Sequence, residues 1–260
     1  IVKTTKKPVE SGGVKKSLLA ALDDLLTEIE PGEVKRVVLS TTIVTNHLAA
    51  GKEERVAVLL IPGPGLPWEL LQLGEDTYFI KGWVDFRGRI VEELDARQVA
   101  KVLGDIKDKG IKRLAVICKF SNRNPELERS IKAQAAKLDP ALQVFLGCEV
   151  AGRLNFPRRV VTTYYTAVTA SVWNNFADEI EQALKERSIG AAIEVLKADG
   201  GTMPIEVSRS NPCETIFSGP AASTMGAVAL TMTDKNAVVV DIGGTTTDIS
   251  LLIDGVPLYA

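Results

Sequence analysis

Two aspartates near the carboxyl-terminal end of the sequence flank a run of residues suited to binding phosphate. Asp241 ends an apolar run that begins at Ala237, two glycines follow it, and Asp248 lies in a second, alternating stretch over residues 247–253. This pattern predicts a β-hairpin, because glycine tolerates the turn and both flanks have the period of a strand. It differs from the G-x-x-x-x-G-K-[ST] and G-x-G-x-x-G patterns, in which glycines lead from a strand into a helix.

The residues of this turn are suited to one chemistry in particular. Glycine lets an anionic oxygen approach the backbone N–H groups, and threonine hydroxyls add donors, which makes phosphate-binding candidates of Gly243, Gly244, Thr245, Thr246 and Thr247. Two carboxylates that face one another over a phosphate are unfavourable unless a cation lies between them or one of them is protonated. Mg²⁺ satisfies both because it prefers one or two carboxylates together with phosphate and water oxygens. Taken alone, the hairpin is equally well interpreted as a plain turn.

Composition and charge exclude several classes of protein. The 260 residues carry 31 basic and 33 acidic side chains, a net charge of −2, so no cationic surface for nucleic acid is expected. Three widely spaced cysteines fit neither a disulfide framework nor a metal pair and indicate a reducing compartment. The longest aliphatic stretch, residues 56–61, is too short for a membrane span, and no signal peptide is evident. These features predict a cytoplasmic protein without membrane contacts.

Helical and strand patterns alternate along the chain, which predicts an α/β fold with helices on both sides of a sheet. The predicted strands cover residues 35–39, 55–61, 112–118, 143–146 and 191–197, with short strand-like pieces over 77–91. The predicted helices run from an N-cap at Ser11 to Pro31, from Asp95 to Gly110, from Asn124-Pro125 to Leu138, and over about 169–187. Residues 62–67, with three prolines, must be a loop. Residues 151–160 are the expected internal boundary.

Several other residues are of types that often have functional roles, but their sequence surroundings favour a structural role. Thr162–Tyr165 is favoured as a strand over a substrate contact, because it is a β-branched and aromatic run. His47 is the only histidine, and without an identifiable partner it is favoured as a partly buried or cleft-edge residue over a general base. The cysteines are favoured as inert thiols, with Cys213 close to a Ser-Gly-Pro-Ala turn. Ser218 is the expected N-cap of a helix whose small residues allow close packing on the hairpin.

The order SGPAAS…VVVDIGGTTTDISLL resembles the second phosphate-binding segment of the actin, sugar-kinase and heat-shock-chaperone ATPase superfamily. Within that superfamily, the chain is more similar to the hydantoinase and 5-oxoprolinase family, of the hydantoinase A type. The similarity rests on four further segments, LSTTIVTNHLAAG, GIKRLAVICKFSNRNPELE, VLKADGG and ETIFSGPAAS, and it extends over nearly the entire chain.

This resemblance implies two ribonuclease-H-like halves, with mixed sheets flanked by helices and a nucleotide cleft between them. It implies an N-terminal region over residues 1–158 and the start of a second ATPase-like half over 159–260. The implied activity is ATP-dependent ring-opening hydrolysis of a cyclic amide such as 5-oxoproline or a hydantoin, with ATP and Mg²⁺ as cofactors. Phosphorylation of the amide oxygen would make the carbonyl carbon more electrophilic toward water.

Site residues are carried over from the motifs. Asp241 and Asp248 would be catalytic and Asp241 a metal ligand, beside the glycines and threonines of the turn. The other cofactor-binding candidates lie in the TTxxTN, ADGG and SGPA segments: Thr41, Thr42, Asn46, Asp199, Gly200, Gly201, Ser218 and Gly219.

The chain also departs from the family pattern. Members normally open with a first G-G-T-x-T-D hairpin, and this sequence starts just after the place of that hairpin and stops before the superfamily's adenosine region. We therefore expect a portion of a longer protein that turns over poorly or not at all by itself. The alternatives are a non-catalytic, nucleotide-responsive regulatory module and a subunit of an ATP-dependent carboxylase. A second hydantoinase-type subunit or a homo-oligomer is the expected assembly.

Overall fold

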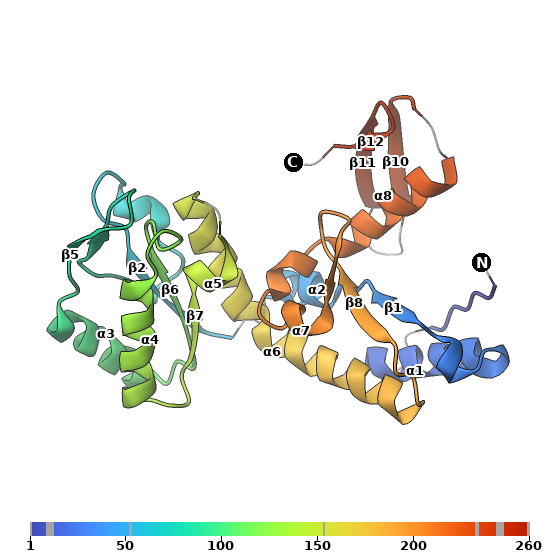
Figure 1. Ribbon diagram of the computed structural model, residues 1–260, viewed down its shortest axis with the longest axis horizontal. Coiled ribbons are helices and arrows are strands. Elements are labelled where there is room, and N and C mark those ends of the chain that lie inside the picture. Colours follow the sequence, from blue (N-terminus) through green and yellow to red (C-terminus); the bar gives the residue numbers. More distant parts are fainter. Residues whose placement is uncertain are drawn as a thin grey trace. The chain divides into compact units, whose positions relative to one another are not determined.

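The chain forms two compact units in the computed structural model, which describes residues 2–8, 13–51, 54–152, 154–231, 234–242 and 247–258 (Figure 1). The first, here called the terminal unit, comprises residues 1–46 and 171–260, and the second, the central unit, comprises residues 47–170. These units do not follow the division at residue 158 that the sequence suggests. That division stays a prediction about the regions of the family, and a continuous helix runs through it.

The helices and strands follow the predicted alternation. The α-helices are α1 (Gly13–Leu25), α2 (Ile43–Ala49), α3 (Ala96–Asp108), α4 (Glu126–Leu138), α5 (Gly147–Val150), α6 (Phe156–Glu186), α7 (Ile205–Ser208) and α8 (Ser218–Thr231), and the 3₁₀ turns are η1 (Leu26–Glu28), η2 (Pro31–Glu33), η3 (Trp68–Leu71) and η4 (Pro212–Thr215). The strands are β1 (Arg36–Leu39), β2 (Val56–Ile61), β3 (Thr77–Phe79), β4 (Trp83–Val84), β5 (Ile90–Glu92), β6 (Arg113–Cys118), β7 (Gln143–Leu146), β8 (Ala192–Leu196), β9 (Thr202–Pro204), β10 (Ala237–Ile242), β11 (Thr247–Ile253) and β12 (Val256–Pro257).

The central unit is a three-layer α/β structure around a parallel sheet in the order β3-β2-β6-β7. Every residue of β2 and β6 is buried, as continuous apolar strands of a parallel sheet require. One core cluster joins alternate residues of these strands to α3 and α4, and a second joins the others to η3 and the first half of α6. The predicted strands over 55–61, 112–118 and 143–146 are confirmed.

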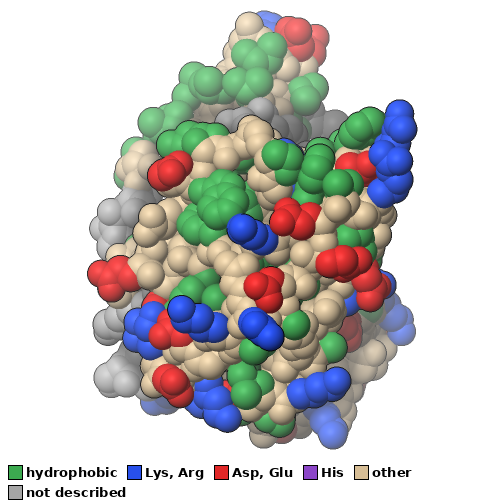
Figure 2. Space-filling model, turned by 90° about the vertical axis from the view of Figure 1, so that its left-hand side faces the viewer, with side chains coloured by type: hydrophobic (Ala, Val, Ile, Leu, Met, Phe, Trp, Pro, Cys, Tyr) green, Lys and Arg blue, Asp and Glu red, His purple; other side chains and the backbone are tan. Residues whose placement is uncertain are grey.

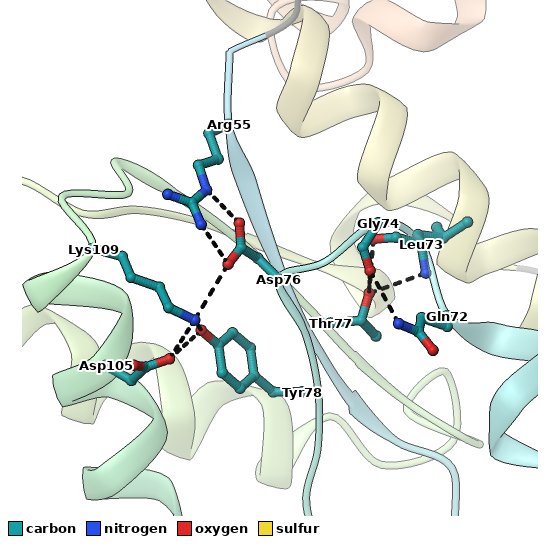
Figure 3. A network of polar contacts seen from close by, with 9 residues as sticks. All are labelled: Arg55, Gln72, Leu73, Gly74, Asp76, Thr77, Tyr78, Asp105 and Lys109. Atoms are coloured by element: carbon teal, nitrogen blue, oxygen red, sulfur yellow. Dashed lines mark hydrogen bonds and ion pairs between the residues drawn. The ribbon is translucent and has the colours of Figure 1, made fainter.

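A network of charged groups ties the amino-terminal ends of β2 and β3 to α3 (Figure 3). Arg55 donates to both carboxylate oxygens of the buried Asp76, at 2.5 and 2.9 Å, and Lys109 lies 3.4 Å from the same carboxylate. Lys109 also pairs with Asp105 at 2.8 Å and donates to the Tyr78 hydroxyl at 2.8 Å. The bond from Lys109 lowers the pKa of Asp105, and burial raises that of Tyr78. Because its positive and negative charges are matched, we interpret this network as structural.

The terminal unit contains two small sheets. In the first, β1 pairs parallel with β8 and β8 antiparallel with β9, so this sheet is mixed. The second is an antiparallel meander of β10, β11 and β12. The second half of α6 is fixed by Trp173, which is fully buried and donates to the Ser208 hydroxyl at 2.8 Å. Together the two units establish an α/β fold with parallel, mixed and antiparallel sheets.

The strand expected over Thr162–Tyr165 is wrong, because these residues lie inside α6. The helix buries positions three or four apart, including Val160, Thr163 and Ala167. Threonine hydroxyls bond to carbonyls one turn earlier, from Thr163 to Arg159 at 2.7 Å and from Thr169 to Tyr165 at 2.6 Å, which satisfies them within a helix. Burial along a helical stripe therefore outweighs the local strand propensity.

Among the described residues, the structure contains no helix with the length and apolar character needed to cross a bilayer.

Candidate functional site

The carboxyl-terminal hairpin carries the two predicted acidic residues directly opposite each other. Asp241 on β10 is the cross-strand partner of Asp248 on β11, and Ile242 and Thr247 form the last pair before the turn. Side chains of directly opposed residues lie on the same face of a sheet, so both carboxylates belong to one face. The predicted hairpin is therefore confirmed in its strands. Gly243, Gly244, Thr245 and Thr246, the predicted phosphate-binding residues of the turn, lie outside the described residues.

Helix α8 packs on the face of the hairpin that bears these carboxylates. The Ser223 hydroxyl donates to Asp241 Oδ2, and the Thr224 hydroxyl donates to Ser250 Oγ at 2.6 Å. The small residues predicted to allow this packing do lie on the helix. Ser223, however, was not among the predicted site residues, although its place five residues after Ser218 puts it about 7.5 Å along the helix axis from the SGPA turn.

The SGPA turn at the start of α8 meets the TTxxTN segment at the start of α2. Ser218 is the first residue of the helix, one position later than an N-cap would be, and its hydroxyl donates to the Thr41 carbonyl at 3.2 Å. A Cβ placed on Gly219 would lie 3.3 Å from Thr42 Cγ2. Asn46 Nδ2 in turn donates to Thr42 Oγ1 at 3.2 Å. The predicted residues from these two distant segments are therefore neighbours.

Phe217, immediately before the turn, has an unusual backbone conformation. Its φ is 63°, in the left-handed region that a bulky residue rarely adopts, and its side chain is 62% exposed. Its amide donates to Thr45 Oγ1 at 3.3 Å, and its carbonyl accepts from the Ala221 amide at 3.2 Å. Strain of this kind is often retained at functional sites, where it fixes the backbone for binding. No local propensity indicates this conformation.

The ADGG turn joins the same region through η4. The Ala198 amide donates to the Glu214 carbonyl at 2.9 Å, and Lys197 Nζ lies 2.8 Å from Asp199 and 3.5 Å from Glu214. Asp199 also accepts from the Gly201 amide at 2.9 Å, and Gly200 has a φ of +80°, which explains the glycine. The bond from Lys197 lowers the pKa of Asp199. Lys197 and Glu214 were not predicted individually, although both lie in the ADGG and SGPA segments.

The predicted segments thus come together around residues 214–223 of the terminal unit. The ADGG turn contacts η4, the TTxxTN segment contacts the start of α8, and Asp241 bonds to Ser223. The described residues contain no group of three or more His, Cys, Asp or Glu side chains able to hold a metal ion. The pair formed by Asp241 and Asp248 fits Mg²⁺, which needs only one or two carboxylates when phosphate and water supply the other ligands.

The residues for which no functional role was predicted form no catalytic pair among the described contacts. His47 is half-buried on α2. Burial raises the pKa of the Cys118 thiol and that of Cys148, the latter to about 12, so both are poor nucleophiles. Cys213 is half-buried within η4.

Comparison with known proteins finds the same family over both parts of the chain. The description "Hydantoinase/oxoprolinase N-terminal region" matches residues 1–138, and "Hydantoinase/oxoprolinase" matches residues 159–260. Caprolactamase subunit alpha of Pseudomonas jessenii is 26% identical over 172 residues, which cover 63% of this chain. 5-oxoprolinase 1 of Arabidopsis thaliana is 23% identical over an alignment of 269 positions, gaps included, that covers 86% of this chain.

A solved structure has a similar fold. A nucleotide-free structure of acetone carboxylase, an enzyme of ATP-dependent acetone carboxylation, covers 97% of this chain with a TM-score of 0.81 and 20% identity. The chain spans only 25% of the caprolactamase subunit, 20% of the 5-oxoprolinase and 40% of the acetone carboxylase chain.

Proposed function

Because the chain belongs to the hydantoinase/oxoprolinase family, we propose that it is part of an ATP-dependent enzyme that opens a cyclic amide by hydrolysis. In this proposal the hairpin of β10 and β11 binds the terminal phosphates of ATP, and the two parts of the chain belong to ribonuclease-H-like halves. The substrate class is a lactam, 5-oxoproline or a hydantoin. Relatives with activities of this kind, a caprolactamase subunit and a 5-oxoprolinase, support it.

One observation carries this proposal. Four segments that are separate in sequence meet around residues 214–223, and each contributes groups suited to bind either phosphate or its Mg²⁺ ion. Three of them, the TTxxTN segment, the ADGG turn and the SGPA turn, offer hydroxyl and backbone donors for phosphate, and the fourth, the paired aspartates of the hairpin, would bind the phosphate only through Mg²⁺. A plain structural turn would not require these contacts. The convergence therefore favours a binding site over a hairpin that only reverses the chain.

The residues of the chain have distinct roles in this proposal. Asp241 and Asp248 would hold Mg²⁺, which would neutralise charge on the phosphate oxygens. Ser223, through its bond to Asp241, fixes the orientation of that carboxylate. Ser218 and Gly219 keep the start of α8 against Thr41 and Thr42, so backbone and hydroxyl donors are positioned before the nucleotide binds.

A second candidate function is a subunit of an ATP-dependent carboxylase. The fold shared with acetone carboxylase over 97% of the chain favours this alternative. The same nucleotide site would then serve to activate a different substrate. Like the caprolactamase subunit among its relatives, the protein would act together with a second polypeptide in either case.

Thermal stabilisation separates the two candidates. Mg-ATP should raise the melting temperature of the chain, and 5-oxoproline or hydantoin should raise it further only when Mg-ATP is present, because the two ligands share one reaction. Bicarbonate in place of the cyclic amide is the matched control. Coupling of Mg-ATP to bicarbonate and not to a cyclic amide would contradict hydrolysis and favour the carboxylase. Absence of any effect of Mg-ATP would contradict both.

A further inference from the structure

The central unit has a pocket of about 380 Å³ that is separate from the cluster around residues 214–223. It lies outside the carboxyl ends of β2 and β3, between the loop that follows β2 and the segment that follows β3. The strand order reverses between β2 and β6, since the chain forms β3 on one side of β2 and then β6 on its other side, so the pocket adjoins this reversal on the β3 side. Open α/β sheets bind their ligands at the carboxyl ends of strands near such a reversal.

Two tryptophans supply the largest apolar surfaces of this pocket. Trp68 stacks on Phe79 with ring centroids 5.3 Å apart and planes 14° apart, so its indole is held in place. Trp83 comes from β4, and Pro64, Leu66 and Ile80 complete the apolar lining. The volume is near the lower limit of small-molecule pockets, about 300–1,000 Å³. A ligand with a short apolar body fits it.

Glycines shape the pocket by letting side chains approach the backbone. Gly63 has a φ of +59°, and a Cβ on it would lie 2.9 Å from Trp83 Cδ1, closer than atoms can pack. Gly82 has a φ of +151°, and its Cβ would lie 3.0 Å from Leu94 and 3.1 Å from Ile61. The indole of Trp83 therefore rests directly on the Gly63 backbone. Both glycines are required for this arrangement of the walls.

The pocket also contains one charge of each sign. Lys81 and Glu92 line it, both are exposed, and neither forms an ion pair within the part of the chain that the structure describes. Glu92 is the cross-strand partner of Trp83, so the carboxylate lies beside the indole. Lys119, by contrast, donates to the Pro64 carbonyl at 2.8 Å and holds the loop. In Figure 2, the visible face of this unit shows hydrophobic side chains among charged ones of both signs.

We propose that this pocket binds a small zwitterion, a molecule that carries an ammonium group and a carboxylate group on a short apolar body. The ammonium group lies between Glu92 and the tryptophan rings, where a carboxylate and the faces of indoles both attract a cation. The carboxylate group pairs with Lys81. The apolar body contacts the prolines and aliphatic side chains of the walls.

Tryptophan fluorescence provides the test, because two of the three tryptophans line the pocket and the third, Trp173, is fully buried in the terminal unit. The probe is 6-aminohexanoate, and the matched controls are hexanoate and hexylammonium, which each carry one of the two charges. We expect a saturable change with 6-aminohexanoate and at least roughly threefold weaker binding of either control. The Trp83→Phe variant should lose the part of the signal that Trp83 supplies and keep that of Trp68.

Variants of exposed residues keep the test independent of folding. Lys81→Ala and Glu92→Gln should each weaken binding of 6-aminohexanoate by roughly threefold to tenfold. Lys101→Ala, at an exposed lysine on α3 away from the pocket, should leave it unchanged. The proposal is overturned by the absence of a saturable change in the unmodified chain, by equal binding of the singly charged controls, or by equal affinity in all three variants.

Discussion

The parallel sheet of the central unit and the hairpin sheet of the terminal unit differ in how they are covered. Both faces of β2 and β6 are buried, whereas among the described residues β10–β12 are covered by α8 on one face only. The other face presents aliphatic side chains to solvent: Val238, Val240, Ile242, Ile249, Leu251, Ile253, Val256 and Leu258.

The difference separates the stability of the chain from its candidate chemistry. The central sheet has a core cluster on each face, and burial of these apolar side chains supplies most of the stability of its unit. The candidate phosphate site belongs to the half-covered sheet, in which Ile242, next to the turn, is 77% exposed. An apolar patch of this kind marks a surface that packs against something else. Mutations should therefore act on stability in one sheet and on binding in the other.

The largest expected effect is on the buried sheet. Leu59→Ala on β2 should lower the free energy of unfolding by about 2–5 kcal/mol, because it leaves a cavity at a fully buried position. The same substitution at Leu251, which is 45% exposed on β11, should cost much less. Urea unfolding of both variants measures this contrast. An equal decrease in the free energy of unfolding in both variants would show that the two sheets contribute equally to stability.

A smaller effect is expected at the strained residue of the site. Phe217→Gly should change stability by only about 1 kcal/mol, because relief of the left-handed φ is offset by the entropy cost of glycine. Mg-ATP should bind more weakly to this variant if the strained backbone positions the SGPA turn. Thermal unfolding and titration calorimetry measure the two quantities separately. Unchanged affinity would remove Phe217 from the site.

Acid should affect the two units to different extents. Asp85 accepts from the Arg87 and Arg89 amides, both at 2.9 Å, and from the Arg89 side chain, and these bonds lower its pKa, the Arg89 amide most. A lowered pKa in the folded state stabilises the fold above the ordinary aspartate pKa of about 4, and this stabilisation disappears as the pH falls through the folded value.

The pH dependence of urea unfolding tests this difference. Asp85→Asn should flatten the fall in stability below about pH 4 more than Asp199→Asn does, because Asp85 is buried and Asp199 is exposed. If the free energy of unfolding fell equally steeply with pH in the two variants, the hydrogen bonds to Asp85 would not add to stability above pH 4.

The smallest effect on folding is expected on the uncovered face. Ile249→Thr should change the free energy of unfolding by less than about 0.5 kcal/mol, because the side chain is 68% exposed and threonine suits a strand. It should, however, reduce self-association at high concentration, which sedimentation velocity measures. A large loss of stability would show that this face is packed in solution.

The fold could be predicted from the sequence where burial and local pattern agree. The continuous apolar runs of β2 and β6 and the capped helix that starts after Asp95 are examples, and Asp95 does accept from the Arg97 amide at 2.9 Å. Prediction failed over Thr162–Tyr165, where tertiary burial along α6 outweighed strand propensity. The order of the central sheet could not be read from the pattern, because pairing depends on contacts between distant segments.

The candidate site was predictable in its motifs but not in its contacts. Asp241, Asp248 and the small residues of α8 follow from local composition. The bond from Ser223 to Asp241 and the link from Lys197 to Glu214 do not, because each joins elements that only the tertiary structure brings together. The left-handed φ of Phe217 likewise could not be predicted from the residue type, and its amide bonds to Thr45 on α2, a contact that only the tertiary structure supplies.

The affinity for Mg-ATP of Asp241→Asn, compared with Asp254→Asn, tests the central claim most directly. Asp241 lies on β10, whereas Asp254 belongs to the turn between β11 and β12, where its positive φ suits asparagine equally well. Titration calorimetry should show Mg-ATP binding weakened by on the order of a hundredfold in Asp241→Asn and unchanged in Asp254→Asn. Equal affinity in the two variants would contradict a phosphate site at this hairpin.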